Sequence, residues 1–460
     1  MTIPQPLWIY PMPRLALLAL LLVSPAFAAD GPTWKAGFAA EKITPDKPLW
    51  MSGYAARTAP AEGTEIDLFA KAAVLEDAAG KKLLLVSLDL VGIDRELSLH
   101  VRSRLTKAFD IPKERIVLAC SHTHCGPVVG LNLRSMYFLS AEQGELVDEY
   151  TAGLPGQIEK VVGRAVKNLE PVTLNMGGGK CSFAVNRREN KETEVPERIK
   201  AGTLKGPVDH DVPVLVARDK AGKVKGIVFG YACHATTLDS LKWSGDYPGY
   251  AMQAVEKANP GAVAVFWAGC GADQNPIPRR TLALAEKYGA QLAESVQQVL
   301  KQQLFAVKPT SNAIYKEIAL PLHELPTREQ LAKDSQDPNK YVAARAKMLM
   351  EKLKTENDLS ASYPYPIQTW QLGDLTWLHL GGEVVVDYSL RFKKELGPVW
   401  VTAYANDVMA YIPSARVLKE GGYEGGGAMV YYGLPSVWGK EVEALIAAEA
   451  ARQVKAARGK

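Results

Sequence analysis

Four apolar runs in this chain end abruptly in clusters of unusual polar residues, and this pattern limits the folds that the chain can adopt. The clusters are SHTH (121–124), CHATT (233–237), GCGADQNP (269–276) and YAND (404–407). Short apolar runs separated by amphipathic stretches predict an α/β fold in which mixed β-sheets are flanked by helices. Ligand sites in open α/β sheets gather beyond the carboxyl ends of strands. We therefore expect these distant clusters to meet at one rim.

The segments between the clusters predict alternating strands and helices. Strand-like runs leading into loops lie within 82–94, 115–124, 262–276, 374–388 and 399–413, and 211–234 has the pattern of a hairpin. Helices are predicted at 95–109, 142–169 (interrupted by Gly and Pro at 153–156), 279–304 and 437–458, with a charged helical region at 327–357.

The N-terminus has the features of an export signal. Arg14 precedes the apolar run LALLALLLV, and Ala26 and Ala28 fit an A-x-A cleavage site. The alternative is a membrane anchor, but the run is shorter than the ~20 residues that a span needs. We predict a signal peptide at residues 1–28, a secreted or periplasmic protein, and one domain over 29–460. No later segment is apolar enough to span a bilayer.

Charge and cysteine content exclude two further classes. The 54 basic and 50 acidic residues give a formal charge of +4 with no Lys/Arg block, so nucleic acid is not expected as a partner. The five cysteines form no CxxC motif, and their odd number leaves at least one unpaired. The fold is therefore not expected to depend on disulfides.

Two of only seven histidines, His122 and His124, stand one residue apart in SHTH. In an extended segment, side chains at i and i+2 point to the same side, so both imidazoles can reach one point. Imidazole is a common zinc ligand. Taken alone, this spacing fits a metal site and a pair of hydrogen-bonded loop histidines equally well.

His234 and Glu383 extend this constellation. His234 follows another apolar run, and read alone it fits a buried loop histidine; beside the HxH pair it becomes a candidate ligand. A catalytic zinc takes three protein ligands and keeps one position for water. Glu383 in LGGEVVVDY would supply a carboxylate, the alternative being an acid at a helix start or in a solvated loop.

Several separated motifs resemble the neutral/alkaline (non-lysosomal) ceramidases, which are zinc amidases. The resemblance runs from ITPDKPLWMSGYAAR (43–57) to YEGG (423–426). Between these ends the motifs occur in the family's order: SHTHCGP, VNRRE, YACHATTL, SGDYPGYA, GGE and YANDVMAYIPSARVLKEGGYEGG.

This resemblance implies a role for each matched residue. The expected zinc ligands are His122, His234, Glu383 and Tyr411, with one Zn²⁺ per chain. The expected catalytic groups are His124 beside the substrate, together with Arg187 (or Arg188) and Tyr423 as polarising groups. Asp246 of SGDYPGYA is interpreted as a structural residue at a helix start.

The implied reaction is hydrolysis of an N-acyl amide bond in a ceramide-like lipid. Zinc lowers the pKa of a bound water to about 7, which provides hydroxide at neutral pH. His124, Tyr423 and Arg187 would stabilise the oxyanion, and an ionisable group would protonate the leaving amine.

The sequence departs from the family at two places. The family has a GDxSPN-type loop with an active-site serine, where this chain has GCGADQNP (269–276) and no serine. Asp273 in this loop is a candidate base or partner of a histidine, or else a turn residue beside Gly271. The β-sandwich domain that follows the catalytic part in ceramidases is expected to be missing.

Two alternatives therefore stay open. The altered loop favours a zinc hydrolase that acts on an ester, a lactone or an N-acylated sugar. A non-catalytic exported binding protein on the same fold is a third possibility, although it has no need to retain four residues around a metal.

Overall fold

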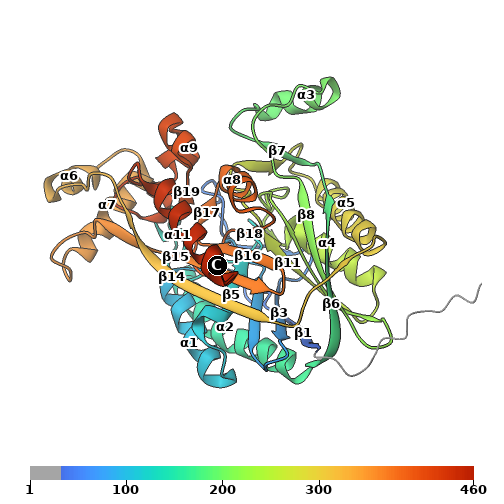
Figure 1. Cartoon of the computed structure of the whole chain (residues 1–460). Coiled ribbons are helices and arrows are strands. Elements are labelled where there is room, and N and C mark those ends of the chain that lie inside the picture. The colour runs from blue at the N-terminus through green and yellow to red at the C-terminus, as the bar shows by residue number, and fades with distance from the viewer. Residues whose placement is uncertain (1–32, 460) are drawn as a thin grey trace, which may run out of the picture. The chain divides into compact units, whose positions relative to one another are not determined.

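Nine strands form the larger of two main sheets, in the order β11-β9-β8-β6-β1-β3-β4-β5 with β13 paired to β6 (Figure 1). The computed structural model describes residues 33–459, so the predicted signal peptide at 1–28 lies outside the described residues. The strands are β1 (Trp34–Lys42), β3 (Phe69–Glu76), β4 (Lys82–Leu88), β5 (Ile116–Cys120), β6 (Glu170–Lys180), β8 (Asp211–Arg218), β9 (Val224–Tyr231), β11 (Val263–Ala268) and β13 (Phe305–Ala306).

The two halves of this sheet pack against each other through alternate side chains. Ala73 and Leu75 of β3 share an apolar cluster with Leu215 and Ala217 of β8. Val74, between the first pair, belongs to a different cluster on the opposite face. Successive side chains of a pleated strand point to opposite faces of the sheet. Because the side chains on both faces belong to apolar clusters, each half of the sheet is buried on both faces.

Helices cover the outer face of each half. Helices α1 (Arg95–Phe109) and α2 (Ala141–Lys167) lie on the β1–β5 side, and α4 (Asp246–Ala258) and α5 (Leu282–Leu300) lie on the side of β6, β8 and β11 (Figure 1). Gly37 of β1 allows the closest approach, because a Cβ there would lie 2.0 Å from the carbonyl oxygen of Ala165.

The interruption predicted at 153–156 is wrong, because α2 continues through Pro155. Proline removes one intrahelical hydrogen bond. The buried face of α2, which includes Leu154 and Ile158, packs on the sheet and offsets that loss.

A four-stranded sheet joins the larger one at the carboxyl ends of β5 and β11. Its order is β14-β15-β16-β18, formed by β14 (Ser311–Pro321), β15 (Ser362–Leu372), β16 (Leu375–Leu380) and β18 (Trp400–Thr402). Isolated bridges link Ala119 to Ala405 and Gly269 to Thr402. These bridges connect the edge strands β5 and β11 of the larger sheet to the segment around β18.

Shorter elements complete the structure. Helix α11 (Val442–Ala457) packs on β14 and β15, and α6 (Arg328–Asp334) and α7 (Lys340–Lys352) lie in the long connection between those two strands. The others are β2 (Gly63–Thr64), β7 (Ala184–Asn186), β10 (Lys242–Trp243), β12 (Gln274–Pro276), β17 (Glu383–Val384), β19 (Tyr411–Ile412), α3 (Val195–Ala201), α8 (Val386–Leu396), α9 (Ala415–Glu420) and α10 (Met429–Tyr432), together with the short helical turns η1 (Lys113–Arg115), η2 (Arg134–Met136), η3 (Glu192–Glu194) and η4 (Tyr423–Gly427).

The predicted α/β class with mixed sheets flanked by helices is confirmed. The pairs β4–β5, β9–β11 and β16–β18 are parallel, whereas β8–β9 and β14–β15 are antiparallel. Among residues 33–459, no helix combines the length and the apolar character that crossing a membrane requires.

Candidate metal centre and its surroundings

His122 and His234 each follow the carboxyl end of a strand in the larger sheet, two residues after β5 and three after β9. The expectation that SHTH is extended is wrong, because His122 has a left-handed φ of 61°. Non-glycine residues rarely take this conformation, and the positions that do cluster at functional sites. A turn, rather than strand alternation, therefore brings His122 and His124 together.

Backbone carbonyls fix the tautomers of two histidines. The Nδ1 of His122 lies 2.6 Å from the carbonyl oxygen of Val91, and the Nδ1 of His234 lies 2.9 Å from that of Gly271. A carbonyl can only accept, so each Nδ1 carries the hydrogen and donates it. Burial, then the nearby Arg187, lowers the pKa of His234 to about 4, so its ring is neutral at pH 7. Its Nε2 therefore presents a lone pair.

Glu383 joins the two histidines from the other sheet region. It lies in β17, which pairs in parallel with β19 and places Glu383 beside Tyr411. Its Oε2 lies 3.1 Å from the Nε2 atoms of both His122 and His234. Burial alone would raise the pKa of Glu383, but positive charge at His122 and His234, which a metal ion held by neutral imidazoles would supply, holds it well below the usual range, so the group is a carboxylate.

These donor atoms fit a metal ion. The Nε2 atoms of His122 and His234 are 3.2 Å apart, and Oε2 of Glu383 has no hydrogen-bond partner in the described part of the chain. Three buried acceptors at such distances repel one another unless a cation lies among them. Ligands held tetrahedrally at ~2.0–2.1 Å from zinc lie roughly 3.3 Å apart, close to the spacing found here. Ligand histidines also commonly donate their second nitrogen to a carbonyl.

His124 completes a buried group of three histidines whose ligand atoms lie within 4.8 Å of one another. Its Nε2 is 3.2 Å from that of His122, and the ring of Tyr54 lies 4.8 Å away. Burial, then the other two imidazoles, lowers the pKa of His124 well below its usual value. Gly53 leaves room for this ring, because a Cβ there would lie 2.4 Å from Nδ1 of His124.

Arg187 and Tyr411 border the centre on the side of His234. The hydroxyl of Tyr411 lies 3.3 Å from Nε2 of His234 and accepts a 3.1 Å hydrogen bond from Arg187. Arg187 also donates to Glu424 at 2.7 Å and to Asn275 at 3.2 Å. Its guanidinium is therefore fixed by three partners from three segments.

Glu424 and Tyr423 lie next to Arg187 and Tyr411, on the side nearer the surface. Burial alone would raise the pKa of Glu424, but Arg187 and Arg188 hold it below its usual range. Arg188, the alternative to Arg187, pairs with Glu424 and with Glu420, and in residues 33–459 it makes no hydrogen bond to Tyr411. The ring of Tyr423 lies 5.2 Å from that of Tyr411, and 43% of Tyr423 is exposed.

The loop at 269–276 supports the centre and does not enter it. Asp273 accepts hydrogen bonds from the N–H of Val386 at 2.8 Å and from Asn186 at 3.4 Å. It thereby caps the start of α8, and burial raises its pKa to about 6. Gln274 donates to the carbonyl of Ala232 and accepts from the N–H of Asp209. Among residues 33–459, no hydrogen bond joins Asp273 to the three histidines.

One open pocket lies next to Arg187, Tyr423 and Glu424. It has a volume of about 550 Å³, and Arg187, Asn275 and Tyr423 are among its lining residues. The three histidines and Glu383 do not line it, so Arg187 is the residue through which this pocket adjoins the centre.

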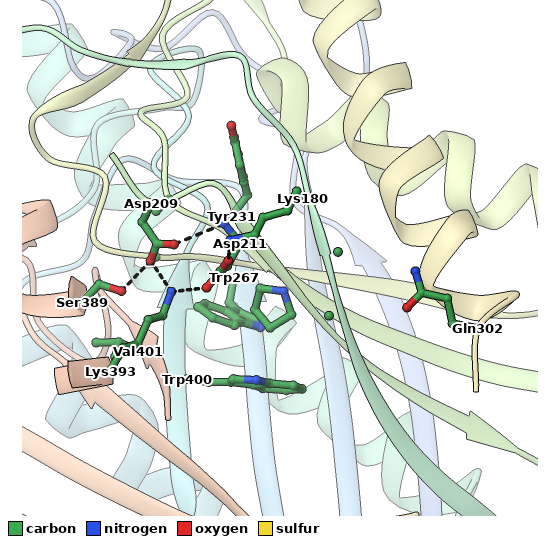
Figure 2. Close-up of a pocket in the computed structure, with 15 residues that line it drawn as sticks. Lys180, Asp209, Asp211, Tyr231, Trp267, Gln302, Ser389, Lys393, Trp400 and Val401 are labelled. Carbon is green, nitrogen blue, oxygen red and sulfur yellow. Dashed lines mark hydrogen bonds and ion pairs between the residues drawn. The ribbon is translucent and has the colours of Figure 1, made fainter. Parts of the chain in front are cut away.

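A second pocket, of about 520 Å³, lies beside α8 and β18. Figure 2 shows Lys393 between Asp209 and Asp211, with Ser389 bonded to Asp209. Its carboxylates are thus paired within the protein, and the network anchors α8, whose first turn begins three residues after Glu383.

Structural roles account for the other residues noted in the sequence. Asp246 accepts from the N–H groups of Leu238 and Tyr247 at the start of α4, as expected. The five cysteines are free and buried.

Sequence patterns missed four residues at the site. The hydroxyl of Tyr432 donates to Oε1 of Glu383. The ring of Tyr404 lies 4.3 Å from that of His122. Asn275 and Glu424 orient Arg187. Tyr404 and Asn275 belong to the polar clusters noted in the sequence, whereas nothing in the sequence near Tyr432 indicated its contact with Glu383.

Two curated ceramidases align with part of the chain. Neutral ceramidase B of Dictyostelium discoideum is 27% identical over 194 residues, which are 41% of this chain and 26% of that protein. Neutral ceramidase 1 of Arabidopsis thaliana is 26% identical over 201 residues, 43% of this chain and 25% of that protein. The chain thus aligns with about a quarter of the length of these relatives.

Solved structures share the fold. Neutral ceramidase from Pseudomonas aeruginosa superposes with a TM-score of 0.72 at 21% identity, over 94% of this chain and 75% of that one. A ceramidase complexed with C2 gives 0.72 at 19%, over 93% and 76%. In addition, residues 34–269, more than half of the chain, match the family model for the N-terminal part of neutral/alkaline non-lysosomal ceramidases. The chain therefore belongs to the neutral/alkaline non-lysosomal ceramidase family.

Proposed function

We propose that this protein is an exported zinc-dependent hydrolase, with one Zn²⁺ per chain, that cleaves the N-acyl amide bond of a ceramide-like lipid. The observation that carries the proposal is the convergence of three buried acceptors, on His122, His234 and Glu383, beside the fixed guanidinium of Arg187. Membership of the ceramidase family supports the choice of an amide substrate.

His122, His234 and Glu383 would hold the ion, with Tyr411 beside them. When bound, zinc supplies Lewis acidity and lowers the pKa of a water molecule. His124, whose Nε2 lies 3.2 Å from that of His122, would take a proton from the attacking water and return it to the leaving nitrogen. A C–O bond forms at the acyl carbon and the C–N bond breaks, which releases a carboxylic acid and an amine.

Arg187 and Tyr423 would stabilise the developing oxyanion. Donors that are fixed before the reaction stabilise such charge most effectively, because no reorganisation is needed when it forms. The three partners of Arg187 provide this fixation. Tyr423 lines the adjoining pocket and is 43% exposed, so its ring can contact a substrate there.

The altered loop supports a second candidate, a zinc hydrolase of another acyl compound such as an ester, a lactone or an N-acylated sugar. Asp273 and Gln274 bond to the protein itself, so neither supplies the contact that a loop serine would make.

Metal analysis and a substrate panel test the proposal. Purified protein should contain about one zinc per chain and should hydrolyse N-acyl sphingosine faster than N-acyl amino acids, N-acylated sugars and acyl esters, with loss of activity after chelation. Preference for one of the other compounds would select the second candidate. Absence of turnover across the panel by the zinc-loaded protein would favour a binding protein instead.

A further inference from the structure

Tyr432 contacts the oxygen of Glu383 that faces away from the histidines. Its hydroxyl donates to Oε1, whereas Oε2 lies 3.1 Å from each of the two Nε2 atoms. The two oxygens of one carboxylate therefore have separate partners. A carboxylate can bind a metal through one oxygen or through both, and an oxygen engaged by a phenolic hydrogen is less available to a metal.

The helix that carries Tyr432 is anchored from outside. α10 is only four residues long, and its last carbonyls have no intrahelical partners. The hydroxyl of Ser135 lies 2.8 and 2.7 Å from the carbonyl oxygens of Val430 and Tyr431 and shares its hydrogen between them. This contact fixes the end of α10 at the residues next to Tyr432.

Tyr411 cannot make the same contact. Its hydroxyl is engaged with His234 and Arg187, and its ring centre lies 6.4 Å from that of Tyr432. Tyr411 thus borders the centre on the side of His234, and Tyr432 lies behind Glu383.

We propose that Tyr432 is a positioning residue that restricts Glu383 to metal binding through Oε2 alone, which keeps one coordination position open for water or the substrate carbonyl. The inference rests on the proposed metal-dependent function. Removal of the hydroxyl frees Oε1 to approach the same ion, and that position then fills with protein oxygen.

The test compares zinc-loaded wild type with Tyr432→Phe by X-ray absorption, which counts the nitrogen and oxygen atoms around the metal. Tyr432→Phe should keep about one zinc per chain, gain about one oxygen neighbour, and lose roughly 10–100-fold in kcat, with little change in KM. Tyr431→Phe is the matched control, because no hydrogen bond of its hydroxyl occurs among the described residues; it should match the wild type in coordination and kcat.

Ser135→Ala gives a second, milder variant that loosens α10 without altering either tyrosine, and it should change coordination in the same direction. An unchanged neighbour count in both Tyr432→Phe and Ser135→Ala would overturn the inference. A wild-type protein that binds zinc and hydrolyses an acyl substrate, with both variants unchanged, would refute the role of Tyr432 alone. A wild type that binds no metal would refute the proposed function as well.

Discussion

The Nε2 atoms of His122 and His234 lie 3.2 Å apart, although the Nδ1–H of each ring donates its hydrogen bond to a backbone carbonyl. Neither Nε2 can donate to the other while both rings are neutral. The carboxylate of Glu383, 3.1 Å from each Nε2, adds a third buried acceptor, and together the three atoms form a set that a metal ion could occupy.

Removal of a ligand should therefore remove the metal. We expect His122→Ala, His234→Ala and Glu383→Ala each to reduce zinc from about one per chain to a small fraction, with loss of turnover. His100→Ala, which changes an exposed histidine in α1, is the control and should keep both. Full zinc and full turnover in any of the three variants would show that its residue is not a ligand.

Chelation should lower stability as well as activity. The buried acceptors lose their counter-charge when the ion leaves, and a ligand that binds only the folded state stabilises it by ~2.7 kcal/mol at a hundred times its Kd. We expect the melting temperature to fall after chelation and to recover when Zn²⁺ is restored. Identical melting curves with and without metal would contradict binding at this buried position.

Arg187→Lys should lower kcat/KM by about 10²–10³-fold, because an ammonium group cannot contact Glu424, Asn275 and Tyr411 together. Stability should change little, since Arg188 still pairs with Glu424 at 2.7 Å. Arg188→Lys is the comparison and should stay nearer to the wild type in rate. A reversed order of the two variants would assign the polarising role to Arg188.

The two hypotheses for Asp273, a cap of α8 and a general base, predict different effects of substitution. If it caps α8, Asp273→Asn retains an acceptor for the N–H of Val386 and keeps most activity, whereas Asp273→Ala lowers the free energy of unfolding by ~1 kcal/mol. Denaturant unfolding and initial rates measure the two effects. Loss of turnover in Asp273→Asn with unchanged stability would instead establish a general base.

Asp407→Asn should change the pH dependence of stability. Burial raises the pKa of Asp407 to about 7, while Tyr363 donates to one of its oxygens at 2.7 Å. Unfolded aspartate has a pKa of about 3.9. As the pH rises from about 4 to 7, the unfolded chain releases a proton that the folded wild type still holds, so the free energy of unfolding falls.

Asparagine has no proton to release at this position. The variant should therefore resemble the wild type at pH 4 and exceed it at pH 8, by about 1.4 kcal/mol for each unit by which the pKa is raised. Denaturant titrations at the two pH values measure the difference. A variant that is less stable than the wild type at pH 8 would contradict a buried charge at Asp407.

Local patterns in the sequence predicted much of the larger sheet. Helix α1 matches the predicted 95–109, and the hairpin of β8 and β9 lies within 211–234. The other sheet was only partly recognised. No strand is predicted for 363–370, which lies within β15, because Pro364 and Pro366 weaken a strand pattern.

The positions of His122 and His234 after apolar runs predicted that these two residues meet, and the family resemblance added Glu383. The contact between Tyr432 and Glu383 could not be predicted in this way. It depends on the docking of a four-residue helix through Ser135, almost three hundred positions earlier, and no local periodicity encodes a contact between such distant segments.

The bridges from Ala119 to Ala405 and from Gly269 to Thr402 connect the edge strands β5 and β11 to the segment around β18. His122 follows β5, and His234 follows β9, the neighbour of β11; β18 in turn pairs with β16, which ends three residues before Glu383. If heat or denaturant first detaches the four-stranded sheet, the carboxylate leaves the imidazoles while most helices remain intact. Loss of the ion and of turnover would then precede the change in far-ultraviolet circular dichroism. Metal content and turnover would then report the separation of the two sheets before the loss of helical structure does.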